Sequence, residues 1–212
     1  DSMGLWIGMV IVFGVIQIAV SLVPVLGSLA SIFLSLTISA GLMIGAQSLD
    51  NGEGLRFDHR FAGFQRNFGQ LLLVGLIYLV GTIVMVILVV VVFGGAMFAL
   101  FMGKEAGALA GMAPATILLA MLLFFALILP LVMSIWFAPA LVALNDVPAV
   151  QAMKLSFIGC LKNFLPFLLY GIVLFLLGIL AIIPIGLGLL LLIPTTVCAN
   201  YVSYKEIFLE EV

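Results

Sequence analysis

The chain has 212 residues, of which 66% are apolar and 8% are charged, and its net charge is −2. Soluble domains carry about 25% charged residues, so this composition excludes a water-soluble fold. The apolar runs are continuous for about twenty residues and lack the alternation of barrel strands, which predicts membrane-spanning helices. With seven Lys and Arg in total, the chain has no basic patch and we expect no nucleic-acid partner.

Six apolar segments in chain order predict an all-α polytopic membrane protein with six transmembrane helices in three hairpins. Turns rich in Pro and Gly separate the spans within the first and third hairpins, because neither residue continues a helix cheaply. We expect one integral membrane domain, residues 1–212, with hairpin units at about 1–50, 51–146 and 147–212. The expected spans are 4–22, 25–46, 71–101, 116–144, 166–183 and a sixth that ends near 204.

Three of these spans contain residues that interrupt helices. The third is long enough to tilt or to break at Gly94 and Gly95. Pro130 and Pro139 predict kinks in the fourth span, and Pro194 predicts an interruption in the sixth.

The basic residues predict how the chain is oriented. Apart from Lys104, every Lys and Arg falls on one side of the six-span topology. Basic loops stay in the cytoplasm, so we expect a multi-pass membrane protein with both termini cytoplasmic. The residues on that side are Arg56, Arg60, Arg66, Lys154, Lys162 and Lys205.

One phrase occurs twice, as FAGFQRNFGQLLLVG at 61–75 and as FIGCLKNFLPFLLYG at 157–171. Helical spacing places an apolar row on one face of each copy, which predicts amphipathic elbow helices at the interface before the second and third hairpins. Asn67 and Asn163 would cap amides of the incoming spans. The two rows are Phe57, Phe61, Phe64 and Phe68 in the first copy and Met153, Phe157, Cys160 and Phe164 in the second.

The elbows have more than one interpretation. They would set the depth of the next span, and the first copy could also bind a particular lipid or dock a partner. The residues predicted to contact lipid at the interface are Phe57, Arg60, Phe61, Phe64, Arg66, Phe68, Lys154, Phe157, Lys162 and Phe164.

Three stretches carry a family resemblance: the phrase that begins at Phe61, the turn IPIGLG at 183–188 and the ending NYVSYKEIF at 200–208. Together they resemble a group of uncharacterised proteobacterial inner-membrane proteins, over most of the chain. The resemblance implies an inner-membrane helical protein and supplies no catalytic residues. Members usually carry an aromatic-rich stretch before the first span, so we expect a further elbow upstream of Met3.

The predicted second span has a stripe of small and polar residues that would serve helix packing, a dimer face or a solute pathway. Gln17 in the first span is expected to hydrogen-bond between helices. The predicted membrane interior lacks ionisable residues, which argues against a proton relay. The possible packing or pathway residues are Gln17, Ser28, Ser31, Ser35, Ser39, Gly41 and Gly45.

His59 is the single histidine, with Asp50, Glu53 and Asp58 near it in sequence. One loop with one histidine is thin support for a metal site, and His59 has no evident nucleophile to activate. We therefore expect no catalytic residues, no metal and no cofactor. Both cysteines are expected to act as small buried apolar residues.

These observations favour a non-enzymatic inner-membrane protein, a scaffold or accessory subunit that contacts lipid or a partner protein. The expected partners are membrane lipids, with a membrane protein or a second copy of the chain as further possibilities. The alternative is a channel or transporter for a small neutral or lipophilic solute, which would use the serine stripe and the proline breaks. A membrane enzyme is the third hypothesis, and it would need Asp58 and His59 to converge with another acid.

Overall fold

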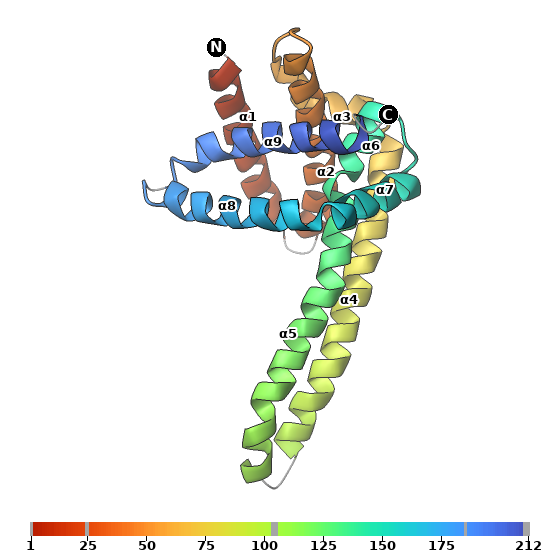
Figure 1. The fold of residues 1–212 in the computed structure, drawn as a ribbon, viewed down its shortest axis with the longest axis vertical. Helices are drawn as coiled ribbons and strands as arrows, with labels where there is room; N and C mark the ends of the chain where they lie inside the picture. Colours follow the sequence, from red (N-terminus) through yellow and green to blue (C-terminus); the bar gives the residue numbers. More distant parts are fainter. Residues whose placement is uncertain (1, 24–25, 103–105, 185, 210–212) are drawn as a thin grey trace. The chain divides into compact units, whose positions relative to one another are not determined.

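A computed structural model of the chain describes residues 2–23, 26–102, 106–184 and 186–209 (Figure 1). Every regular element in these residues is helical, and none of them forms a strand, so the all-α prediction is confirmed. The elements are α1 (Ser2–Ser21), α2 (Leu26–Asp50), the 3₁₀ helix η1 (Phe57–Phe61), α3 (Ala62–Gln65), α4 (Phe68–Met102), α5 (Ala106–Trp136), α6 (Ala138–Asn145), α7 (Ala149–Lys162), α8 (Phe164–Ile182) and α9 (Leu189–Phe208).

Four of the described helices are long and apolar enough to cross a bilayer. Helix α1 adds a shorter apolar stretch, Gly4–Val20. The six-span arrangement in three hairpins therefore stays a prediction. The four candidate spans are Leu29–Asp50, Phe68–Val91, Met121–Asn145 and Phe164–Ile182.

The chain divides into two compact units, and the first comprises Asp1–Gly75 and Ser134–Val212. Helix α6 forms the core of this unit: its residues 138–143 are all buried, and it packs against α2 and α7. A helix that is apolar on every side is suited to such a position. Helix α9 packs against α1, α2 and α8, and the α8–α9 pair runs antiparallel (Figure 1).

The second unit, Leu76–Met133, contains most of α4 and α5. Gly81 brings the two helices close, because a Cβ at that position would lie 2.6 Å from Cδ2 of Leu131. Most described side chains of this unit are exposed and apolar. Such side chains suit a lipid solvent, since lipid tails are as apolar as leucine.

The expected interruption at Pro194 and the expected kink at Pro139 differ from the structure, and of the two alternatives for the third span the break is absent. Helix α9 runs from Leu189 to Phe208 with Pro194 inside it. Helix α4 runs unbroken through Gly94 and Gly95, since a glycine costs a helix only about 1 kcal/mol. Helix α5 continues past Pro130 and ends at Trp136. Pro139 lies in the first turn of α6, where a missing N–H does not matter, so a new helix begins there.

The first copy of the repeated phrase is not the single helix that its spacing predicts. It forms η1 and the four-residue α3, and the chain then turns at Asn67 with φ of 53° before α4 begins. The matching segment of the second copy is one helix, α7, of 14 residues.

Candidate functional site

Polar side chains in unit 1 link the ends of helices that are far apart in sequence. They come from the last residues of α2 and α6, the chain just before α4, and the final turns of α9. We call this set the polar junction: Asp50, Asn67, Asn145, Asp146, Tyr201, Tyr204 and Lys205.

Helix α9 contributes three side chains to the polar junction. Nζ of Lys205 lies 2.9 Å from Oδ2 of Asp50, and the Tyr201 hydroxyl donates to the same oxygen over 3.4 Å. Tyr204 is fully buried and donates to Oδ1 of Asn145. Because the Asp50 and Lys205 side chains are about 40% exposed, their ion pair contributes little stability.

Asn67 and Asp146 both adopt left-handed backbone conformations, with φ of 53° and 55°, and bond to each other. Nδ2 of Asn67 donates to the Asp146 carboxylate and, over 3.1 Å, to the Val142 carbonyl near the end of α6. Arg66 lies 3.7 Å from Asp146. Oε1 of Gln70 accepts the Ala149 amide over 2.8 Å. The start of α4 is thus tied to the end of α6 and the start of α7.

The expected role of the two asparagines is wrong in one respect. Both side chains donate hydrogen bonds through Nδ2, and these bonds do not involve an amide of the incoming helix. Asn67 donates to the Val142 carbonyl, and Asn163 donates to the Gly159 carbonyl in the last turn of α7 over 3.0 Å. Asn67 therefore caps the end of α6, which lies later in the chain, and Asn163 caps the end of α7, which precedes it. The helix that follows each asparagine is served by its backbone carbonyl.

The predicted interface residues of the first copy lie on the surface. Its four phenylalanines, Phe57, Phe61, Phe64 and Phe68, form a set that we call the Phe ridge. Each is between 37% and 40% exposed. Ring centroids lie 6.3 Å apart for Phe61 and Phe64 and 5.6 Å apart for Phe64 and Phe68. Arg66 is exposed beside them, and the Arg60 side chain lies outside the described part.

The matching row of the second copy is half buried, with two of its four residues inside the protein. Met153 and Cys160 are buried, Phe157 is half-buried and Phe164 is 47% exposed at the start of α8. Lys154 and Lys162 are exposed on other faces of α7.

Two small polar residues, Ser156 and Cys160, lie on the buried face of α7. Ser156 is fully buried, and its Oγ accepts the Phe137 amide over 3.0 Å, which fixes the start of α6 to α7. Burial raises the pKa of the Cys160 thiol to about 11, so this cysteine is not a poised nucleophile.

The predicted stripe of small and polar residues lies on α2, and Ser35 in it hydrogen-bonds within that helix. Ser31, Ser35 and Ser39 are half-buried, and Oγ of Ser35 donates to the Ile32 carbonyl of its own helix over 2.9 Å. The side chain of Ser28 lies outside the described part. Gly41 and Gly45 are both buried.

Gly45 faces η1 and the residues just before it. A Cβ there would lie 3.0 Å from the Leu55 side chain and 3.5 Å from that of His59. Gln17 on α1 differs from the serines, because its Oε1 is buried and finds no hydrogen-bond donor among the described residues.

His59 is tied to its own loop. Its Nδ1 accepts the Arg56 amide over 3.3 Å, and Arg56 pairs with Asp58 at 2.9 Å. A backbone hydrogen bond, and then the Arg56 guanidinium, hold the pKa of the Asp58 carboxyl below its usual value. Within the described part of the chain, no three His, Cys, Asp or Glu side chains converge as metal ligands would.

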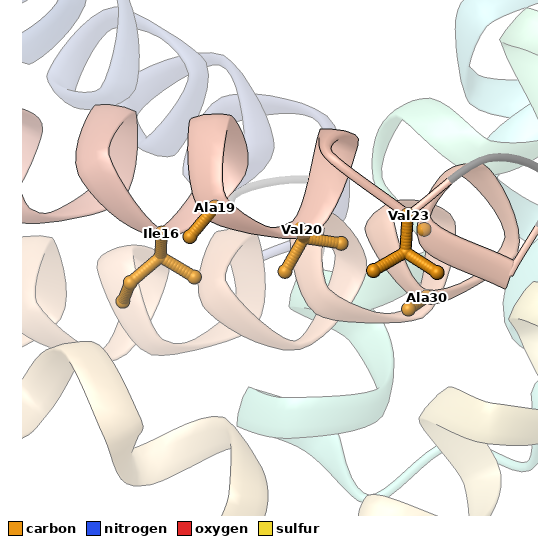
Figure 2. A pocket seen from close by; sticks show the side chains of 6 residues that line it. Ile16, Ala19, Val20, Val23 and Ala30 are labelled. Carbon is orange, nitrogen blue, oxygen red and sulfur yellow. The ribbon is translucent and has the colours of Figure 1, made fainter.

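A pocket of about 460 Å³ lies beside the turn between α1 and α2. Figure 2 shows its apolar side chains along α1 and the start of α2. Ser31, Ser35 and Ser39, the stripe serines whose side chains the structure describes, do not line this pocket, so it is suited to an apolar group and not to a polar solute. Its lining residues are Ile16, Ala19, Val20, Val23, Gly27 and Ala30.

Sequence reasoning missed the polar junction and Ser156. A signal was present in Asn145 and Asp146, which end an otherwise apolar run, and in Tyr201 and Tyr204, because a buried tyrosine hydroxyl usually finds a hydrogen-bond partner. Their partners lie up to 155 residues away, as for Asp50 and Lys205, so the pairing depends on the tertiary fold.

Comparison with known proteins agrees with the predicted resemblance. The chain is 29% identical over 213 residues to a probable inner membrane protein of Burkholderia thailandensis, and the match covers 89% of this chain and 78% of that protein. No family model matches the chain, and no solved structure matches it. The resemblance to inner-membrane proteins is therefore confirmed. This relative and the apolar helices together support a membrane location.

Proposed function

We propose that the protein is a non-enzymatic scaffold or accessory subunit of the bacterial inner membrane, which packs laterally against lipid or a partner protein. The observation that carries this proposal is the surface of α8. Ala181 is the single buried residue in this 19-residue helix. Phe175 is 69% exposed, and Leu165 is 65% exposed. An apolar surface of this size requires lipid or protein to cover it.

The polar groups also support the proposal. The polar junction joins helix ends within the chain, and Ser35 bonds to its own helix, so these groups build the fold instead of lining a reaction site. The bias of basic residues supports cytoplasmic termini. The polar junction would then lie at the cytoplasmic side.

The proposal can be tested with a photo-crosslinking phenylalanine analogue at position 175 of the full-length protein in cells. A matched probe at Val150, which is 65% exposed on α7, reports background capture. We expect the probe at position 175 to crosslink one membrane protein in stoichiometric amount and the probe at position 150 not to crosslink it. The same protein should remain bound in native mass spectrometry. Capture of lipid alone at 175 would contradict the accessory-subunit role.

The pocket beside the α1–α2 turn favours a second candidate, a channel or transporter for a small lipophilic solute. Ala30→Phe would fill this pocket, and Ser35→Ala would remove a hydroxyl from the stripe outside it. Solute flux into proteoliposomes that falls with Ala30→Phe and not with Ser35→Ala would favour transport through the pocket. Equal flux in all three proteins and in empty liposomes would exclude it.

A further inference from the structure

The Phe ridge is held outward by the backbone beneath it. Gly63 in α3 lies so close to α2 that a Cβ there would be 2.1 Å from the Thr37 carbonyl oxygen. Leu55, just before η1, is buried against α1. These contacts leave the short helices η1 and α3 no room to rotate, so the phenylalanine rings cannot turn into the protein.

The ridge is continuous with a candidate membrane span. Phe68 is both the first residue of α4 and the first residue of the span Phe68–Val91. The Phe64 and Phe68 rings are in contact. The ridge therefore begins where the apolar span begins, at the depth where headgroups meet acyl chains.

The charges around the Phe ridge are too few to attract it to anionic lipid headgroups. Residues 51–66 contain three arginines and two acids, Glu53 and Asp58, so their net charge is +3 − 2 = +1. Arg56 is paired with Asp58, and Arg66 lies near Asp146. Binding through apolar contact is thus favoured over binding through anionic headgroups, which takes a cluster of several basic residues.

The second copy exposes only part of its matching row, of which Phe164 is 47% exposed. Met153 and Cys160, which align with Phe57 and Phe64, are buried. We propose that the Phe ridge inserts into the acyl boundary of the bilayer beside the start of α4, whereas the second copy buries Met153 and Cys160 of its row within unit 1. The occupant of the ridge is the bilayer itself. This inference rests on the membrane location within the proposed function and not on a protein partner.

The test uses the aligned pair Phe61 and Phe157. Trifluoromethyl-phenylalanine is placed at either position of the full chain, which is reconstituted in phosphatidylcholine nanodiscs. Fluorine relaxation is then measured with a spin-labelled lipid and with a water-soluble gadolinium chelate. At position 61, we expect the spin-labelled lipid to enhance fluorine relaxation at least threefold more than the gadolinium chelate does. At position 157, the relaxation enhancement by the spin-labelled lipid should be at least threefold weaker than at 61.

Each other outcome overturns the proposal. A dominant chelate effect at 61 would place the ridge in water, and no effect from either reagent would mean that protein covers it. Equal lipid effects at 61 and 157 would remove the difference between the copies. Replacing 30% of the lipid with phosphatidylglycerol should change the effect at 61 by less than twofold, and a larger change would mean that charge drives binding. Failure to capture a protein partner would contradict the proposed accessory-subunit role and leave these results unchanged.

Discussion

The two copies of the repeated phrase have similar sequences, but the first exposes all four residues of its apolar row, whereas the second buries Met153 and Cys160 of its row. The residues upstream of each phrase explain the difference. On the face that α7 buries, the second copy has small residues where the first has charged ones, and a charged side chain is not buried without a partner. The aligned pairs are Glu53 with Ala149, Arg56 with Ala152 and Arg60 with Ser156.

The aligned glycines show the same contrast. Gly63 approaches a backbone carbonyl of α2, whereas a Cβ on Gly159 would meet the Phe208 ring at 2.7 Å. A backbone atom cannot move aside, but a ring near the end of α9 can. Similar sequence patterns thus create contacts of different rigidity, and the following variants test how far the two copies differ.

The largest effect is expected in thiol reactivity at the aligned positions 64 and 160. A Phe64→Cys variant should react with N-ethylmaleimide at pH 7.5 at least a hundredfold faster than Cys160. Raising a thiol pKa from 9.0 to about 11 lowers the thiolate fraction about a hundredfold, and burial limits access as well. Reaction at Cys160 should keep accelerating as the pH rises past 9. Peptide mass spectrometry separates the sites, and comparable rates would contradict the buried second copy.

The next effect separates the two glycines. Gly63→Ala should destabilise the protein by about 3 kcal/mol, since the methyl group would overpack against the Thr37 carbonyl. Gly159→Ala should change stability by less than about 1 kcal/mol, because a better helix propensity offsets the displaced Phe208 ring. Thermal unfolding in one detergent gives the ranking. A reversed ranking would show that α3 is the mobile element.

The two asparagines come third. Asn67→Ala should cost about 2 kcal/mol, because alanine disfavours a φ of 53° and two hydrogen bonds are lost. Asn163→Ala loses one bond at a φ of −106° and should cost about 1 kcal/mol. Asn67→Gly keeps the backbone conformation and should lie between them. If all three variants unfold at the same temperature, the tie between α4 and α6 is not a stabilising contact.

The smallest effect is expected outside both copies, at the exposed ion pair of the polar junction. Lys205→Met should leave the unfolding temperature within experimental error of wild type at 0.15 M salt, since screening and side-chain entropy cancel most of such a pair. A clear loss that disappears at 1 M salt would mean that Asp50 and Lys205 hold α9 in place.

Several properties could be predicted from local sequence. Composition and run length predict an all-helical membrane protein, because a chain with 8% charged residues cannot cover its surface in water. The sequence also shows the repeated phrase and predicts the central residues of the long helices. Helix limits were less predictable: Gly94 and Gly95 stay helical, and Pro139 starts a helix instead of bending one.

The sequence by itself determined the solvent of this protein and its helical class, since both follow from how many apolar residues occur in a row. Only the tertiary structure decided which copy of the phrase faces outward, what the asparagines cap and how Asp50 meets Lys205. These features depend on which atoms approach from distant segments, such as the Thr37 carbonyl beneath Gly63. The same local pattern therefore has different roles in the two copies.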